Sequence, residues 1–214
     1  MKDPQTTVIY YTSNREPEEF EQKIRDNLLK AIGGLPLISV SQKPINLGKN
    51  ICVGDDIGVS NQNSHRQLQI GAMAATTPFV HIAEADTLYP KEYFQYLPPT
   101  MDRIYRMPIY LLYLNRKTWR RDIFYRKDSS ECSIVVGREY MINLIENNLK
   151  DCGMWSRTQE HQRQTFNKTY SLFDLKVPVI SIKTGYGLHG THKNNGHARK
   201  LPYWGRANDV IKLI

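Results

Sequence analysis

The sequence has few cysteines and no long apolar run. Its three cysteines, Cys52, Cys132 and Cys152, are too few and too scattered for a disulfide framework or a zinc site, so we expect buried thiols. The longest apolar run, Ile109 to Leu114, is far too short to cross a bilayer. Residues 1–4 lack the apolar stretch of a signal peptide. We therefore expect a cytoplasmic protein without a transmembrane segment.

The composition is that of an ordinary globular chain. Hydrophobic residues make up 40% of the 214 residues and charged residues 23%, which excludes disordered and fibrous classes. This length suits one domain, and it is long enough to bury a core without disulfides.

Acidic residues are scarce relative to basic ones. There are 21 Asp and Glu against 29 Lys and Arg, a net charge of +8, which favours nucleic acid, diphosphate ligands or an anionic membrane surface as partners. Residues 103–127 hold eight basic residues and one acid among six aromatic residues, and residues 183–206 hold five basic residues, three histidines and no acid. Each stretch alone fits a solvated surface equally well.

The first elements form a strand–helix–strand unit. Residues 7–11 are β-branched and aromatic, which predicts a buried strand. Pro17 suits the first turn of a helix that Gly33 ends, and residues 35–40 predict a second strand. Such a unit normally closes right-handed into a parallel pair.

The later elements predict an α/β domain whose first half is mainly parallel and whose second half is less regular. Ser64 to Gln67 has the spacing of a capping box and predicts the start of a helix. The remaining expected elements are strands at 79–83, 109–114, 133–136 and 177–182 and a helix at 138–149, with 177–182 as the last strand.

Two carboxylates follow the strand predicted at 79–83. In an extended backbone, residues two apart point to the same side, so Glu84 and Asp86 are expected to converge. Two carboxylates that repel each other are naturally compensated by a divalent cation, and ligands of open α/β sheets bind at the carboxyl ends of the strands. An exposed acidic turn is the alternative.

The surrounding residues resemble the GT-A glycosyltransferases. The likeness lies in the helix with Asn63-Ser64-His65-Arg66-Gln67-Leu68-Gln69-Ile70-Gly71-Ala72, in Thr76-Thr77-Pro78-Phe79-Val80-His81-Ile82-Ala83-Glu84-Ala85-Asp86, and in Leu88-Tyr89-Pro90 and Tyr93-Phe94. This order matches the family's helix, its short apolar strand ending in Asp-x-Asp, and its proline-aromatic turn. The likeness covers roughly the first half of the chain, and Glu84 departs from the pattern in place of Asp.

The resemblance implies a GT-A-like single domain, with a central mixed sheet flanked by helices. Residues 1–97 would bind a nucleotide sugar, and residues 98–214 the acceptor. Asp86, with Glu84, would hold Mn²⁺ or Mg²⁺ on the donor diphosphate, where the ion neutralises charge on the leaving group. Thr12 and Asn14 resemble the family's uridine-contacting start, which points to a UDP-sugar.

Further donor contacts come from three residues. Arg66 is placed by the sequence near the positive end of its helix, where it could clamp phosphates, although a surface arginine is as good an interpretation. Asp55 and Asp56 could contact the ribose or base, but a Gly-Asp-Asp turn needs no function.

The C-terminal half supplies the other expected groups. Many GT-A enzymes take a third metal ligand from a late histidine, which His189 or His192 resembles, and an imidazole would favour manganese. Glu160 is the local candidate for a catalytic base, and Trp155 for stacking on a sugar or base. A polar loop and a solvated helix start are the alternatives. His81, within an apolar strand, is expected in the core.

The acceptor is inferred from charge alone. Basic stretches with aromatic residues suit phosphates and an extruded base, and so suggest an enzyme resembling phage glucosyltransferases that modify hydroxymethylated pyrimidines in DNA, active in the host cytoplasm. The expected contacts are Arg116, Lys117, Trp119, Arg120, Arg121, Trp155, Lys193, Arg199 and Lys200.

Other functions stay open. A saccharide, a lipid-linked sugar or a protein could be the acceptor. A nucleotidyltransferase is disfavoured because the loop at 12–16 lacks glycines. A non-catalytic nucleic-acid-binding protein would explain the charge but not Glu84 and Asp86 at a strand end.

Overall fold

The computed structural model describes residues 3–114, 122–158, 169–185 and 196–214. The helices of this part of the chain are α1 (Glu18–Ile32), α2 (Asn61–Ala74), α3 (Lys91–Gln95), α4 (Arg138–Leu149) and α5 (Ala207–Ile211), with a 3₁₀ turn, η1 (Glu131–Ser133). The strands are β1 (Thr6–Thr12), β2 (Leu37–Ser41), β3 (Lys49–Cys52), β4 (Phe79–Glu84), β5 (Thr87–Leu88), β6 (Ile104–Arg106), β7 (Ile109–Tyr113), β8 (Phe124–Lys127), β9 (Ile134–Gly137), β10 (Tyr170–Leu172), β11 (Val179–Lys183), β12 (His197–Ala198), β13 (Lys200–Leu201) and β14 (Gly205–Arg206).

Most of these strands form two sheets. The larger sheet has seven strands in the order β10-β6-β9-β4-β1-β2-β3, and the second has five in the order β12-β8-β7-β11-β5. In the larger sheet β3, β2, β1 and β4 are parallel, whereas β9 is antiparallel to both β4 and β6. The expected α/β fold, a single domain with a central mixed sheet flanked by helices, is confirmed.

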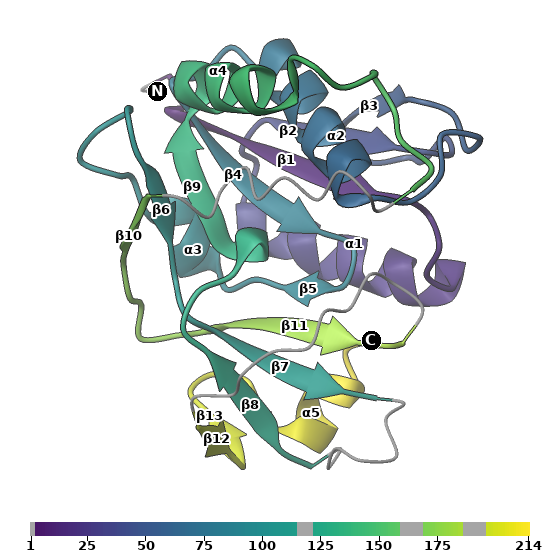
Figure 1. The fold of residues 1–214 in the computed structure, drawn as a ribbon. Helices are drawn as coiled ribbons and strands as arrows, with labels where there is room; N and C mark the ends of the chain where they lie inside the picture. Colours follow the sequence, from purple (N-terminus) through teal and green to yellow (C-terminus); the bar gives the residue numbers. More distant parts are fainter. Residues whose placement is uncertain (1–2, 115–121, 159–168, 186–195) are drawn as a thin grey trace.

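Helices cover both faces of the larger sheet, and the second sheet lies on one of these faces. Figure 1 shows α2 and α4 on one face, with α1, α3 and the five-stranded sheet on the other. The first face is buried under the apolar side of α4, which contributes Met141, Ile145 and Leu149. The other face packs Leu28 of α1 and Tyr93 of α3 beneath β1.

Local sequence explains the first unit. The side chains of β1 are nearly all buried, as expected for a β-branched and aromatic segment with sheet neighbours on both sides. Three glutamates occupy the first turn of α1, where the helix dipole favours negative charge. Gly33 ends this helix with φ 59°, a left-handed conformation that glycine adopts without strain.

Three sequence expectations are corrected. Helix α2 begins at Asn61 rather than Ser64, because the Ser60 side chain caps it by accepting a hydrogen bond from the Asn63 amide. β11 is followed by the three short strands β12 to β14, so it is not the last strand. Of the cysteines Cys132 is buried, but Cys52 is exposed, because its strand β3 lies at the edge of the sheet.

In the part of the chain that the structure describes, no helix combines the length and the apolarity needed to cross a membrane.

Candidate active site

The carboxyl ends of β1, β2 and β4 meet at one edge of the larger sheet, because these strands are parallel. From β1 the chain moves to β2 and β3 on one side and then returns to β4 on the other side. This change of direction is a topological switch point, and open α/β sheets bind their ligands at the carboxyl edge beside such a point. Residues after Thr12 and Glu84 therefore border the candidate site.

Asp86, just beyond β4, is held by an ion pair from the second sheet. The Lys183 ammonium lies 3.0 Å from Asp86 Oδ2, and the Thr87 hydroxyl donates a hydrogen bond to Oδ1. The Ile182 amide donates to the Asp86 carbonyl at 2.7 Å. The side chains of Asp86 and Lys183 are each only 12% exposed, so this pair is largely shielded from water.

Glu84, the last residue of β4, is a half-buried residue beside this pair. The Tyr11 hydroxyl donates a short hydrogen bond to Glu84 Oε1, and the Glu84 amide donates to the Tyr89 hydroxyl. Burial, followed by the charge of Asp86, raises the pKa of Glu84 to about 7. The two acids therefore influence each other, and one of them readily keeps a proton near neutral pH.

A third carboxyl comes from the loop before α1. Glu16 Oε1 accepts a hydrogen bond from the Thr184 hydroxyl at 2.9 Å, whereas its Oε2 is buried and has no hydrogen-bond partner. Burial raises the pKa of Glu16, and the charge of Asp86 raises it further. We call Glu16, Glu84, Asp86 and Lys183 the edge cluster.

The edge cluster fits a divalent cation bound together with other ligands. Its three acids face one ammonium, and the charge of Asp86 adds to the effect of burial in raising the pKa values of Glu84 and Glu16. Carboxylate oxygens suit Mg²⁺ or Mn²⁺. However, within residues 3–114, 122–158, 169–185 and 196–214 no three metal-ligating side chains are gathered closely enough to hold an ion. Diphosphate oxygens would be needed to complete such a site.

A second group of charges lies beside Glu84, on η1. Glu131 Oε2 is 3.5 Å from the His65 Nε2 atom of α2, and its Oε1 is 3.6 Å from the Arg106 guanidinium. Neighbouring positive groups hold the pKa of Glu131 below its usual value, although partial burial opposes this shift. The Tyr89 hydroxyl accepts a hydrogen bond from the Glu84 amide and donates one to the Cys132 carbonyl, so it links η1 to the end of β4. The charged Glu131 carboxylate of η1 is thereby kept close to the end of β4.

Sequence reasoning missed Glu16, Lys183 and Glu131 as site residues. In the sequence, Glu16 is one of several acids before and within the first turn of a predicted helix, and Lys183 is one of five basic residues in the stretch 183–206. The polar pair Lys183-Thr184 directly after an apolar strand was the available signal.

The predicted nucleoside contacts lie on neighbouring loops. The Arg15 guanidinium donates a hydrogen bond to the Asp55 carbonyl at 3.4 Å, which joins the loop after β1 to the loop after β3. Asp55 and Asp56 are exposed. The Asn14 side chain accepts a hydrogen bond from the Lys43 amide, so the loop after β2 adjoins them.

Thr12 and Arg66 are turned to other partners. The Thr12 hydroxyl is buried and donates to Glu21 of α1 at 3.0 Å. The Arg66 guanidinium pairs with Glu146 of α4 at 3.0 Å and donates to the Leu149 carbonyl. Arg66 thus joins α2 to α4 and is not brought together with the edge cluster. Because α2 begins at Asn61, Arg66 lies in the second turn of the helix rather than at its N-terminus.

The histidine expected in the core is there. His81 is fully buried, its Nδ1 lies 2.7 Å from the Thr6 hydroxyl, and burial lowers its pKa to about 3. Trp155 is half-buried on the loop after α4. This loop is held at the start of α2, where the Gln62 side chain donates a hydrogen bond to the Gly153 carbonyl and the Asn63 side chain accepts one from the Ser156 amide.

Many predicted acceptor residues fall outside the described part. Arg199 and Lys200 are described and exposed. The residues outside the described ranges are Arg116, Lys117, Trp119, Arg120, Arg121, Glu160, His189, His192 and Lys193.

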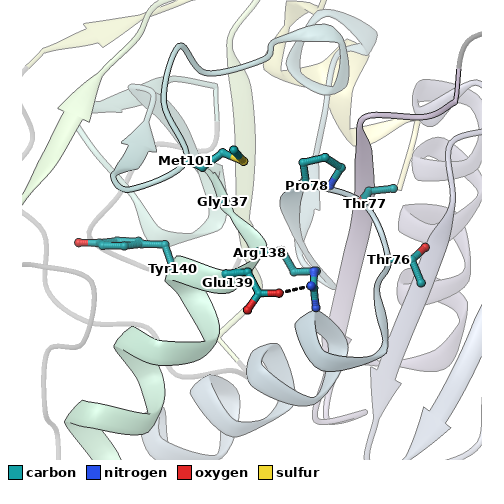
Figure 2. Close-up of a pocket in the computed structure, with 8 residues that line it drawn as sticks. All are labelled: Thr76, Thr77, Pro78, Met101, Gly137, Arg138, Glu139 and Tyr140. Atoms are coloured by element: carbon teal, nitrogen blue, oxygen red, sulfur yellow. Dashed lines mark hydrogen bonds and ion pairs between the residues drawn. The ribbon is translucent and has the colours of Figure 1, made fainter.

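A pocket lies at the opposite end of β4, away from the edge cluster. Figure 2 shows its walls: the segment before β4 with Thr76, Thr77 and Pro78, the Met101 side chain, and the start of α4 from Gly137 to Tyr140. Arg138 forms an ion pair with the neighbouring Glu139 there. None of the residues that line this pocket belongs to the edge cluster.

Comparisons with known proteins show similarity of structure only. No sequence profile of a known family matches the chain, and neither does any curated protein. A glycosyltransferase involved in glycosylation of the major capsid of PBCV-1 aligns with TM-score 0.47 and 11% identity, over 83% of this chain and 93% of that one. S. aureus TarS 1-349 in complex with UDP-GlcNAc aligns with TM-score 0.47 and 12% identity, over 88% and 60%.

Another similar structure is the bifunctional IspDF from Campylobacter jejuni, with TM-score 0.43 and 13% identity, over 76% of this chain and 52% of that one. The chain thus spans about half of IspDF and 60% of the TarS segment. Likenesses at this level do not decide an activity, so the functional argument rests on the chain's own residues.

Proposed function

We propose that this protein is a glycosyltransferase that takes a sugar from a nucleoside diphosphate sugar, with a UDP-sugar as the expected donor and Mn²⁺ or Mg²⁺ as cofactor. The observation that carries this proposal is the edge cluster, which places Glu84 and Asp86 at the carboxyl end of β4, where β1 and β4 pair. A group of partly buried carboxyls at this position suits a site for a divalent cation and a diphosphate.

Donor binding would use two neighbouring regions. Asn14, Asp55 and Asp56 border the loops after β1 and β3, where the nucleoside would lie. Asp86 and Glu84, with His189 or His192, would hold the cation. When bound, this ion stabilises the charge that develops on the leaving diphosphate. Tyr11 fixes the Glu84 carboxyl through its hydrogen bond, which keeps the acid directed along the edge.

The second half would bind the acceptor. We assign residues 1–97 to the donor and residues 98–214 to the acceptor, with Lys183 as a residue of the second half that reaches the donor site. Glu160 is proposed as the base that takes the proton of the acceptor hydroxyl, and Trp155 as its stacking partner.

The decisive experiment is a donor screen. The melting temperature of the protein is measured with UDP-, GDP- and TDP-sugars, each with Mn²⁺ or with EDTA. One class of donor should raise the melting temperature in the presence of Mn²⁺ but not in EDTA. A donor at a hundred times its dissociation constant adds about 2.7 kcal/mol of stability. The same donor should be slowly hydrolysed, with release of nucleoside diphosphate. Lack of any donor-dependent shift would remove the proposal.

A nucleotidyltransferase is separated by its products. It would release pyrophosphate from a nucleoside triphosphate, whereas the proposed enzyme releases a nucleoside diphosphate from a nucleotide sugar. Assaying both products with the same preparation decides between them.

As acceptor we propose hydroxymethylated pyrimidines in DNA. The supporting observation is that basic Arg199 and Lys200 are exposed close in sequence to Tyr203, whose side chain is 80% exposed. Exposed cations with an aromatic ring suit phosphates and an unpaired base. Labelled sugar should pass to DNA carrying this modified base and not to unmodified DNA. Transfer to a free saccharide alone would remove the DNA acceptor and keep the glycosyltransferase.

Charge variants test the same surface. Replacing Arg199 and Lys200 by Gln should weaken binding equally for different DNA sequences, and each lost phosphate contact should reduce the log–log salt slope by about one. Donor binding should not change, since neither residue belongs to the edge cluster.

A further inference from the structure

The ion pair of Asp86 with Lys183 poses a problem for metal binding. The acid expected to bind the cation already contacts an ammonium at 3.0 Å, and both side chains are only 12% exposed. A metal ion that approached Asp86 alone would have to displace Lys183. The ammonium would then lose its carboxylate partner in a poorly solvated place, which is costly.

A diphosphate changes this balance. Lysine is a common phosphate ligand because its ammonium has three donors on a flexible stem. Lys183 is the last residue of β11, and its carbonyl accepts a hydrogen bond from the Leu114 amide, so the backbone is anchored while the side chain can change partner. A phosphate beside Asp86 offers the ammonium a new anionic partner without taking it into water.

The cation also needs the phosphates. The edge cluster provides carboxylates, but the described residues include no group of three metal-ligating side chains. A divalent ion that bridges a carboxylate and two phosphate oxygens completes its coordination only when the nucleotide is present. Both effects act in the same direction: the nucleotide releases Asp86 and supplies ligands.

We propose that Lys183 is a positioning residue that occupies Asp86 in the free protein and passes to the donor diphosphate when it binds, which leaves Asp86 to the divalent cation. Metal and nucleotide then bind cooperatively, and by thermodynamic linkage each raises the affinity of the other by the same factor. This inference rests on the proposed function, since it takes a nucleoside diphosphate as the ligand of the edge cluster.

Lys183→Gln separates the two roles, because glutamine keeps a hydrogen-bond donor but no charge. Calorimetric titration with MnCl₂ alone should show binding to the variant that is about fivefold tighter than to the wild type, because the competing ammonium is gone. Titration with UDP in EDTA should show binding about tenfold weaker, because the phosphate loses its cation. The factor by which UDP tightens Mn²⁺ binding should therefore shrink.

Two further variants control this measurement. Lys127→Gln removes a positive charge from the same surroundings without touching the Asp86 ion pair, and it should keep the wild-type coupling of Mn²⁺ and UDP. Lys183→Arg keeps the charge and should keep most of the coupling. Thermal melting without ligands verifies that every variant is folded. If Lys183→Gln does not fold, the coupling of Mn²⁺ and UDP binding is compared between Lys183→Arg and the wild type.

Each result has one meaning. Opposite signs for the two ligands with Lys183→Gln support the proposal. Weaker or unchanged Mn²⁺ binding, unchanged UDP binding in EDTA, or an equal effect of Lys127→Gln overturns it while leaving the proposed function in place. A wild-type protein that binds no nucleoside diphosphate at all overturns the proposed function together with this inference.

Discussion

Two groups of acids adjoin the start of α1, where the charge of Glu16 influences the pKa of Glu21, and the two groups are built differently. In the first, which we call the α1 network, Glu21 accepts hydrogen bonds from Thr12 at 3.0 Å and Arg25 at 3.3 Å, and Tyr10 lies at 3.5 Å. Its partners lie 4, 9 and 11 residues from it in sequence. In the edge cluster, Asp86 and Lys183 are 97 residues apart.

The two groups share one electrostatic property. Burial raises the pKa of both Glu21 and Glu84 to about 7. Both oxygens of Glu21 have partners, whereas the edge cluster leaves Glu16 Oε2 without one. A perturbed pKa therefore does not by itself mark a functional site; an incomplete set of partners at the edge of a sheet is the more informative sign.

The largest expected effect is on stability, in the α1 network. Arg25→Met should lower the free energy of unfolding by about 3–4 kcal/mol, because the Arg25 side chain is 3% exposed and its loss leaves Glu21 buried without its cation. Donor affinity per folded molecule should be unchanged. Urea denaturation measures the loss, and Lys30→Met, at an exposed position of the same helix, is the control. A loss below about 1 kcal/mol would contradict the assignment.

The pH dependence of stability distinguishes Glu21 from its neighbours. Its folded pKa of about 7 exceeds the ordinary glutamate value of 4.5, so the folded state keeps a proton between these pH values that the unfolded state loses. The contribution of Glu21 therefore falls as pH rises through this window, by up to about 3 kcal/mol. Glu21→Gln should remove this slope in denaturation at pH 4.5 and 7.5. Glu19→Gln, at an exposed position of α1, should keep it.

In the edge cluster the largest effect is on rate. Asp86→Asn should lower kcat for sugar transfer about 100-fold, because the expected metal ligand becomes neutral. A cooperative unfolding transition should be retained. Steady-state assays of nucleoside diphosphate release measure the loss, and Asp26→Asn on the exposed side of α1 serves as the matched change. Turnover like that of the wild type would mean that Asp86 does not bind the cation.

A smaller effect is expected where Thr184 meets Glu16. Thr184→Val removes the hydroxyl that donates to Glu16 Oε1, so Glu16 should hold its proton to higher pH and attract a cation less. The Mn²⁺ concentration for half-maximal activity should rise by up to about tenfold, with little change in the melting temperature. An unchanged Mn²⁺ requirement, like that expected for Thr100→Val in a surface turn, would place Glu16 outside the site.

Local patterns predicted the elements that depend on local interactions. The β1–α1–β2 unit was predictable from β-branched residues, the acidic first turn and Gly33, and so was α4 at 138–149. The start of α2 was not predictable, because Ser60 and Ser64 both offer a capping hydroxyl. Only the hydrogen bond from the Asn63 amide shows that Ser60 is the cap. Strands of two residues, such as β5, have no periodicity to read.

Only the part of the site that depends on local sequence was predictable. Glu84 and Asp86 follow an apolar strand, so position alone singled them out. Lys183 could be matched to Asp86 only through the antiparallel pairing of β5 with β11, which no single-sequence pattern reveals. Arg66 shows the opposite case: its type suited a phosphate, but tertiary contacts with α4 decided its role.

The segment from Glu84 to Thr87 joins the two sheets, because β4 belongs to the larger sheet and β5 pairs with β11 in the second. Asp86 is therefore held only after residues 179–183 have been synthesised and have folded back. Contacts of such long sequence separation form late, since their loop-closure entropy must be overcome first. A nascent chain that has exposed only its first half can pair β1, β2 and β4, but its carboxylates stay in water. Completion of β11 thus brings the site together.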